Sequence, residues 1–211
     1  MMPRRSESSW RVRILVTSED VAERVRALGH EPVLCPLIRI EPLSDELLDL
    51  SVWDWVVVTS RNGARELGRR LIEPPRHLAA IGPGTAEALQ EQGLEVDLIP
   101  HVHTQEGLRD ELPPGRTLLA AAEGARRDVL DADFLPLYRT HELVPDPPPE
   151  GDLALLLSPS AARALGASGA HMPVVAIGPQ TAAEARTQGF DVAAVAASHD
   201  LDGLVDAVRS L

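Results

Sequence analysis

The sequence IGPGTAEALQEQG at residues 81–93 returns, with few changes, as IGPQTAAEARTQG at residues 177–189. In both copies an apolar run ends in Ile-Gly-Pro, and a helical pattern then closes on a glycine. The same strand, turn and helix are therefore expected twice. Two strings this similar in one chain indicate that a larger structural unit is repeated.

Other matches extend the repeat to most of the chain. PLIR, which begins at Pro36, matches PLYR, which begins at Pro136, and TSRNGAREL matches LSPSAARAL, which pairs Ser60 with Ser158. Short apolar runs alternate with helical patterns, and this alternation predicts parallel sheets covered by helices. Each repeat is too small for a complete doubly wound sheet, so we expect two α/β lobes.

The periodicity predicts a strand or a helix for most of the chain. The proline-rich VPDPPPEG at residues 144–151 is expected to be a stiff connector. The expected strands and extended runs are 14–17, 32–40, 55–60, 78–82, 96–100, 116–122, 134–144, 152–158, 174–178 and 192–196. The expected helices are 18–29, 45–50, 61–71, 85–93, 124–130, 160–169, 181–189 and 201–211.

Composition excludes several function classes. The chain has 211 residues, 44% of them apolar, which is enough for a sizeable core. Its net charge is -12, and it lacks the basic surface that nucleic-acid binding requires. All 20 basic residues are arginines, so no lysine is available for a Schiff base or a phosphate loop. Arginine instead suits planar anions such as carboxylates.

Cysteine and histidine give little sign of redox or metal chemistry. Cys35 is the one cysteine and lies in an apolar run, so we expect it in the core. His101 and His103 would share one face of a strand, but no third ligand stands at a recognisable spacing, so surface histidines are expected rather than a metal site. Without a long apolar run, we expect a cytoplasmic protein that does not span a membrane.

Hydroxyl residues recur where the predicted strands meet their helices. Ser60, Thr85, Ser158 and Thr181 all stand at such junctions. In open α/β sheets, ligands bind beyond the carboxyl ends of the strands, where helix starts offer unpaired N–H groups to anions. If the lobes face each other, the four starts would line one cleft for a polyanion. The alternative is that these hydroxyls are ordinary helix caps.

Two further features have competing interpretations. Tyr138 is the only tyrosine, and its repeat partner is Ile38, so an apolar packing role would explain it. Its phenol stays protonated at neutral pH, however, and could donate a proton. Gly82-Pro83-Gly84 hints at a dinucleotide loop, but the later glycine is missing and the second copy has Gln180 in place of Gly84.

The combined motifs resemble the uroporphyrinogen-III synthase family. The resemblance is carried by VVVTSRNGARELGRRL, AAIGPGTAEALQEQGLEVDLIP, PLYRT and VVAIGPQTAAEARTQGFDV, and it covers nearly the whole chain in the family's order. It implies two flavodoxin-like lobes with parallel sheets, joined by a two-stranded ladder, with each repeat exchanged between the lobes. Lobe 1 would comprise residues 1–37 and 143–211, lobe 2 residues 41–137, and the connecting strands residues 37–41 and 138–143.

The resemblance also implies a reaction. The family cyclises hydroxymethylbilane, an open tetrapyrrole with eight carboxylates, to uroporphyrinogen III with loss of water and inversion of the terminal ring through a spiro intermediate. A hydro-lyase of haem biosynthesis is therefore expected, without metal or organic cofactor and as a monomer. Tyr138 would be the general acid. The residues expected to bind substrate are Ser60, Thr85, Ser158, Thr181, Gly82, Gly178, Arg13, Arg39, Arg65, Arg139 and Arg163, with Arg61 and Arg126 as further candidates.

Two positions depart from the family's pattern. Ser18 follows Thr17 where an arginine is common, and Ala122-Glu123-Gly124 stands where Arg-Gly is usual. An anion contact at each position would be lost or moved. Two other functions stay open: a non-catalytic module that binds polyanions on the same bilobed scaffold, and an unrelated α/β enzyme that acts on a phosphorylated metabolite.

Overall fold

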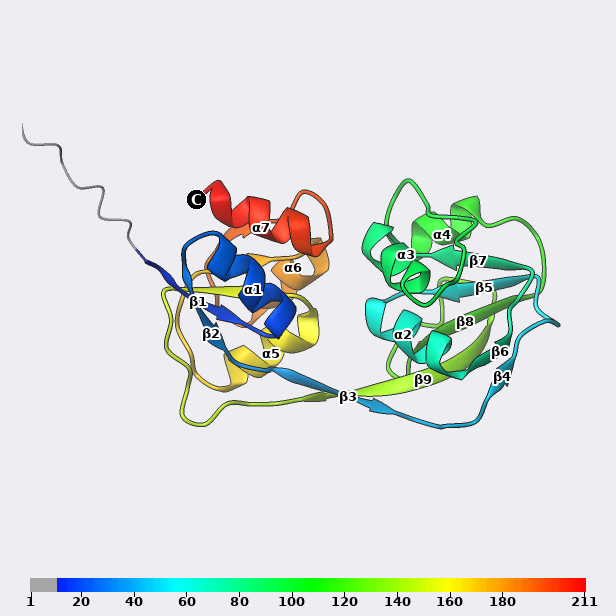
Figure 1. Ribbon diagram of the computed structural model, residues 1–211, viewed down its shortest axis with the longest axis horizontal. Coiled ribbons are helices and arrows are strands. Elements are labelled where there is room, and N and C mark those ends of the chain that lie inside the picture. The colour runs from blue at the N-terminus through cyan, green and yellow to red at the C-terminus, as the bar shows by residue number, and fades with distance from the viewer. Residues whose placement is uncertain (1–10) are drawn as a thin grey trace, which may run out of the picture. The chain divides into compact units, whose positions relative to one another are not determined.

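The computed structural model describes residues 11–211, which divide into two α/β units. Unit 1 combines the described residues up to Arg39 with Glu142–Leu211, and unit 2 comprises Ile40–His141. The chain therefore crosses between the units twice, after Arg39 and after His141. Figure 1 shows unit 1 built from the blue and the yellow-to-red segments, and unit 2 from the segments between them.

Unit 1 contains a parallel sheet with the strand order β12-β11-β10-β1-β2. If the five strands are numbered 1 to 5 in chain order and the sheet is read from β2 to β12, the order is 2-1-3-4-5. This is the order of flavodoxin-like sheets. In its central strands β10 is apolar and buried throughout, and β1 is apolar and buried after Arg13, as expected for a sheet that is covered on both faces. The strands are β1 (Arg13–Val16), β2 (Glu31–Leu34), β10 (Leu153–Leu156), β11 (Val174–Ala176) and β12 (Val192–Val195).

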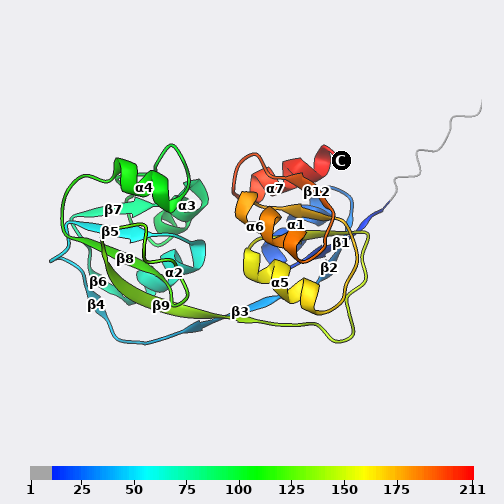
Figure 2. The same cartoon turned by 180° about the vertical axis from the view of Figure 1, so that it is seen from behind.

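Helices cover both faces of this sheet (Figures 1 and 2). Helices α1 (Glu19–Ala27) and α7 (Leu201–Arg209) pack on the face that carries Ile14 and Val16. Helices α5 (Pro159–Ala167) and α6 (Pro179–Thr187) pack on the opposite face. Alternate residues of β1 and β10 thus enter different cores, which is the side-chain alternation of a strand.

Unit 2 contains a second sheet with the order β3-β9-β8-β5-β7. The pairings of β5 with β7, of β5 with β8 and of β8 with β9 are all parallel. A small separate sheet pairs β4 (Leu48–Asp49) with β6 (Leu71–Glu73). The strands of the main sheet are β3 (Ile38–Pro42), β5 (Trp55–Val58), β7 (His77–Ala80), β8 (Thr117–Ala122) and β9 (Asp133–Glu142).

The helices of unit 2 also pack on both faces of its main sheet. Helices α2 (Arg61–Arg70) and α3 (Pro83–Gln90) bury Leu67 and Leu89 against one face. Helix α4 (Gln105–Glu111) buries Leu108 against the other face. The sequence pattern predicts no helix in this last segment, so α4 is an addition to the expected elements.

The two sheets have matching strand orders. Leu98 forms a parallel bridge to Ala79, which places a short extended segment beyond β7. A strand is predicted at residues 96–100, and in the structure this segment forms only the single bridge at Leu98. With that segment included, unit 2 reads Leu98-β7-β5-β8-β9 where unit 1 reads β12-β11-β10-β1-β2. Matching positions are filled by matching parts of the two sequence repeats.

The segments that pass between the units lie in neighbouring strands, β3 and β9. The amide of Leu43 donates to the carbonyl of Leu137, and the amide of Leu143 donates to the carbonyl of Leu37. Between these two hydrogen bonds the residue number rises from 37 to 43 along β3 while that of its partner falls from 143 to 137, so the two strands run antiparallel.

Two predicted short helices are wrong. Residues 45–50 form no helix: Ser44 Oγ accepts the amide of Glu46 in a local turn, and Leu48–Asp49 is strand β4. A stretch this short is a poor helix alone. Residues 124–130 also form no helix. There the guanidinium of Arg127 lies over the Phe134 ring, and Leu130 enters the core as part of an irregular cover.

Candidate functional site

Two serines begin helices at the carboxyl ends of central strands. Ser60 follows β5 and is the N-cap of α2, where its Oγ accepts the amide of Gly63 at 2.9 Å. Ser158 follows β10 and is the N-cap of α5, where its Oγ accepts the amide of Ala161 at 3.1 Å. Both serines therefore act as caps. Each also stands at the switch point of its sheet, where chain connections leave toward opposite faces and ligands commonly bind.

The serine of unit 2 has an additional partner. The Ser60 hydroxyl forms a 2.8 Å hydrogen bond with the phenol of Tyr138, which extends from β9 and is only 4% exposed. Burial raises the pKa of the Tyr138 phenol, and the hydrogen bond with Ser60 lowers it by a smaller amount. The phenol thus remains protonated at neutral pH and is linked through Ser60 to the amide end of α2.

Two threonines lie in the first turns of α3 and α6. Both helices begin with Gly-Pro, and the N-caps Gly82 and Gly178 provide no capping side chain. Thr85 and Thr181 are three residues further on, 6% and 3% exposed, and their hydroxyls bond to no other described residue. The capping alternative therefore fails for these threonines. Each helix start combines uncapped amides with an unpartnered hydroxyl, a combination suited to an anion.

A histidine lies beside each of these glycine caps. A Cβ built on Gly82 would stand 3.4 Å from Cγ of His103, and one built on Gly178 would stand 3.2 Å from Cδ2 of His199. Both imidazoles therefore border a helix start that contains a buried threonine. In the sequence, His103 was a candidate for metal binding alone, and His199 was not a candidate for any role.

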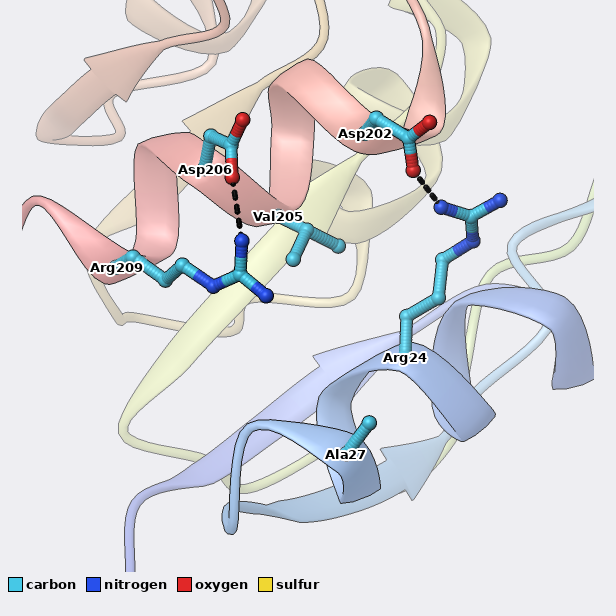
Figure 3. A pocket seen from close by; sticks show the side chains of 6 residues that line it. All are labelled: Arg24, Ala27, Asp202, Val205, Asp206 and Arg209. Carbon is cyan, nitrogen blue, oxygen red and sulfur yellow. Dashed lines mark hydrogen bonds and ion pairs between the residues drawn. The ribbon is translucent and has the colours of Figure 1, made fainter.

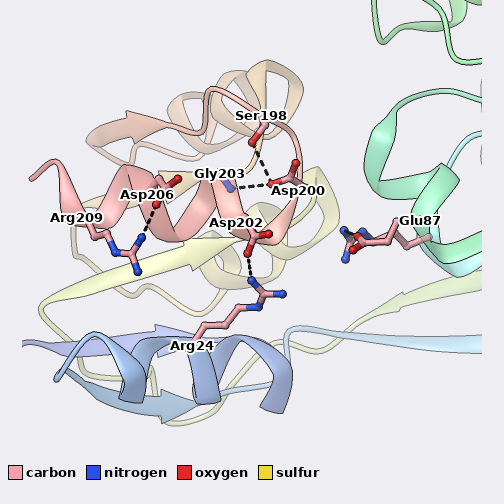
Figure 4. Close-up of polar contacts among 9 residues, drawn as sticks. Arg24, Glu87, Ser198, Asp200, Asp202, Gly203, Asp206 and Arg209 are labelled. Carbon is pink, nitrogen blue, oxygen red and sulfur yellow. Dashed lines mark hydrogen bonds and ion pairs between the residues drawn. The ribbon is translucent and has the colours of Figure 1, made fainter. Parts of the chain in front are cut away.

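A second repeated motif could have identified these histidines. His-Thr-x-x-Gly-Leu at 103–108 matches His-Asp-x-x-Gly-Leu at 199–204. In the second copy Asp200 caps α7 by accepting the amide of Gly203 at 2.7 Å, and Ser198 also donates to it (Figure 4). A Cβ on Gly203 would lie 2.2 Å from the Ser198 carbonyl, so a side chain cannot fit there.

Four of the seven candidate arginines are held by carboxylates of the protein. Arg139 binds Glu123 through two hydrogen bonds of 2.7 and 2.8 Å. Arg163 binds Glu142 at 2.7 Å and approaches Glu184 at 3.6 Å. The further candidates are paired too: Arg126 with Glu106 and Arg61 with Glu87, both at 2.7 Å.

The other three predicted arginines are exposed and make no ion pair with a described residue. Arg13 begins β1, at the amino edge of its sheet, so the structure does not bring it to the helix starts. Arg39 lies in β3, and Arg65 lies in the second turn of α2, on the helix that Ser60 begins. Arg65 is therefore the one of these three nearest in sequence to a helix start.

The carboxyl ends of β1 and β8 carry acids rather than basic groups. After β1, Ser18 makes no side-chain cap, and Glu19 and Asp20 occupy the first turn of α1. After β8 stands Glu123, whose pKa is lowered mainly by the hydrogen bonds from Arg139. These two strand ends are therefore poorly suited to binding an anion. They are the positions at which the sequence departs from the family's pattern, at Ser18 and at Ala122-Glu123-Gly124.

Other surfaces show no comparable arrangement. Within residues 11–211 no group of three metal-ligating side chains is suitably placed, and His101 instead bonds Glu111. No helix in this range is long and apolar enough to cross a membrane. A shallow depression between α1 and α7 is charged, but its charges pair internally, Arg24 with Asp202 and Arg209 with Asp206 (Figure 3).

Comparison with known proteins agrees with this arrangement. A family described as "Uroporphyrinogen-III synthase HemD" matches residues 19–206. The "Porphyrin biosynthesis protein HemD" of Ruminiclostridium josui is 31% identical over 110 residues, covering 43% of this chain and 22% of that protein. The "Uroporphyrinogen-III synthase" of Synechococcus elongatus is 27% identical over 109 residues, covering 46% and 41%. These matches thus span less than half of each relative.

A solved structure shares the fold. The crystal structure of a mutant uroporphyrinogen III synthase from the extremely thermophilic bacterium Thermus thermophilus aligns with a TM-score of 0.60 and 19% identity. The alignment covers 94% of this chain and 98% of that one. At this identity the likeness concerns the fold, and the chemistry has to be argued from the residues of this chain.

Proposed function

Because the chain belongs to the uroporphyrinogen-III synthase family, we propose that it closes hydroxymethylbilane to uroporphyrinogen III as a hydro-lyase of haem biosynthesis. The observation that carries the proposal is the 2.8 Å bond between Tyr138 and Ser60 at the start of α2. A buried, protonated phenol at a switch point provides an acid where a ligand is expected to bind.

In the proposed reaction, Tyr138 donates its proton to the leaving hydroxyl of the substrate. The carbon–oxygen bond breaks and the hydroxyl departs as water. The phenolate that forms can then accept a hydrogen bond from Ser60, whose oxygen accepts in turn from the amide of Gly63. The positive end of the α2 dipole thereby stabilises the developing negative charge. The cation left on the substrate then forms the carbon–carbon bond that closes the ring and loses a proton. A proton is thereby returned to the phenolate, and burial favours the neutral phenol.

The helix starts are proposed to hold the carboxylates. Thr85 and Thr181 are buried, have unpartnered hydroxyls and follow the uncapped residues Gly82 and Gly178. Their hydroxyls, and the amides of Gly84 and Gln180 directly before them, can donate to substrate carboxylates without breaking a hydrogen bond to a described residue. Ser158 can contribute its remaining hydrogen-bonding capacity in unit 1. Holding the chain in a closing conformation is then the main contribution to ring inversion.

We also infer that the chain arose by duplication with exchange between the units. The matching strand orders support this, because each repeat supplies parts of both sheets. On this proposal the boundaries of the lobes follow the sequence prediction, with residues 37–41 and 138–143 as connecting strands. A monomeric state remains a prediction, which sedimentation equilibrium would test.

Product isomers provide the decisive test. Hydroxymethylbilane is generated in situ, the protein is added, and the products are oxidised and separated by chromatography. The proposal expects the type III isomer above the spontaneous type I background. Binding of the tetrapyrrole with type I product alone would indicate the non-catalytic polyanion module. If the protein neither binds the tetrapyrrole nor selects an isomer, the result would favour the unrelated α/β enzyme.

A further inference from the structure

Arg61 lies over the start of helix α3. It is the first residue of α2, directly after Ser60. A Cβ built on Gly84 would stand 2.9 Å from Nε of Arg61 and 3.0 Å from its Nη2. The guanidinium therefore occupies the space next to Gly84, in the first turn that also contains Thr85. The glycine leaves room for the arginine at this start.

The guanidinium is held in place, yet it retains binding capacity. Nη2 donates to Oε2 of Glu87, one turn further along α3, at 2.7 Å. The Arg61 side chain is 26% exposed and Glu87 is 61% exposed. A guanidinium has five N–H donors, and the contact with Glu87 occupies one of them. The remaining N–H groups of Arg61 have no hydrogen-bond partner among residues 11–211. Arg61 can therefore bind a carboxylate of a ligand while Glu87 orients it.

Unit 1 lacks all three parts of this arrangement. In the repeat, Arg61 corresponds to Pro159, Gly84 to Gln180 and Glu87 to Ala183. The cation, the space for it and the acid that holds it are thus replaced together. Tyr138 shows the same asymmetry, since its repeat partner is Ile38. Two of the differing residues thus flank the shared Ser60: Arg61 directly follows it at the start of α2, and Tyr138 bonds its hydroxyl.

We propose that Arg61 is a positioning residue that binds a carboxylate of the substrate ring at which closure occurs, beside Tyr138. This inference rests on the proposed function. An open tetrapyrrole carries carboxylates on every ring. The uncapped helix start of α3 alone would therefore not select which ring lies beside Tyr138. Arg61 favours the direction that presents the leaving hydroxyl to Tyr138.

The test compares KM and kcat for type III formation in four variants. Arg61→Gln removes the charge, and we expect KM to rise about 10-fold with kcat within about 3-fold, the signature of lost binding. Arg61→Lys retains the charge without the fork and should recover part of the loss. Gly84→Gln should displace the guanidinium and raise KM similarly. Arg69→Gln removes an exposed arginine of the same helix and is the matched control.

Each result has a distinct consequence. A KM for Arg61→Gln within about 2-fold of that of Arg69→Gln overturns the inference, as does a large fall in kcat at constant KM. Thermal unfolding of each variant separates misfolding from binding, and a KM rise at unchanged melting temperature supports the inference. If the wild-type protein yields type I product alone, the proposed function itself fails. If the wild type yields type III, the Arg61 comparison tests the inference alone.

Discussion

Replacement of Tyr138 by phenylalanine tests the proposed acid most directly. The substitution removes one oxygen atom from a side chain that is 4% exposed and leaves the ring packing intact. It also removes the 2.8 Å bond to Ser60. Ser60 keeps the amide of Gly63 as a donor, so no capping bond is lost. We therefore expect the free energy of unfolding to fall by about 1 kcal/mol.

The expected effect on catalysis is much larger. General acids contribute roughly 100- to 10,000-fold to the rates they assist, so kcat for type III formation should fall by about this factor in Tyr138→Phe. The assay measures initial rates from freshly generated hydroxymethylbilane with chromatographic separation of the isomers. Urea unfolding of the same preparation measures the stability change. A rate within about threefold of wild type would refute the assignment of the acid.

Ser60→Ala extends the test to the partner of the phenol. This variant loses the α2 cap, at a cost of about 1 kcal/mol, and leaves the phenol without its hydrogen bond. If the two groups act as a unit, the double variant should be no slower than Tyr138→Phe alone. Fully additive losses in kcat would show that serine does not act through the tyrosine.

Three further predictions concern fold, binding and pH. Gly107→Ala places a Cβ 2.0 Å from the Val102 carbonyl oxygen and should lower the free energy of unfolding, measured in urea, by about 3 kcal/mol. In the control Gly124→Ala, the added Cβ meets nothing within 4 Å and should cost little. Equal urea midpoints for the two variants would contradict the close approach at Gly107. Thr181→Val retains the shape of the side chain but removes its hydroxyl, so KM should rise about 10-fold at unchanged melting temperature, and an unchanged KM would exclude this contact. Glu123 has a lowered pKa, so its ion pair stabilises the fold above the unfolded value of about 4.3 and is lost as the pH falls through the folded value. The difference in urea midpoint between wild type and Glu123→Gln should therefore shrink below about pH 4, and a constant difference would argue against the pair.

The repeated phrases made much of the fold predictable. Long periodic segments such as 61–71 and 181–189 became helices, because their apolar faces have a sheet to cover. Short segments were not predictable in this way. Residues 45–50 and 124–130 have compositions compatible with a helix, but tertiary contacts determine their conformation. Helix α4 was missed because its seven residues show little periodicity.

The residue types of the site could be predicted from the sequence better than the contacts between their side chains. Hydroxyls at strand ends follow from sequence order, and Ser60 and Thr85 do lie at helix starts. Sequence alone could not show that Arg139 binds Glu123, because that contact depends on which strands are neighbours. The position of Arg61 over Gly84 was hidden for the same reason, although their joint replacement in the second repeat was visible.

The double crossing between the units has a consequence for synthesis on the ribosome. Residues 40–141 are contiguous, so unit 2 can fold as soon as they emerge. Strand β1 must wait, because it pairs with β10, and Asp152, which accepts the amide of Arg13, lies 139 residues further along. Until then the apolar run Ile14-Leu15-Val16 is an open strand edge, prone to pair with other nascent chains. Early termination after residue 141 would therefore leave a finished unit 2 tethered to an aggregation-prone fragment.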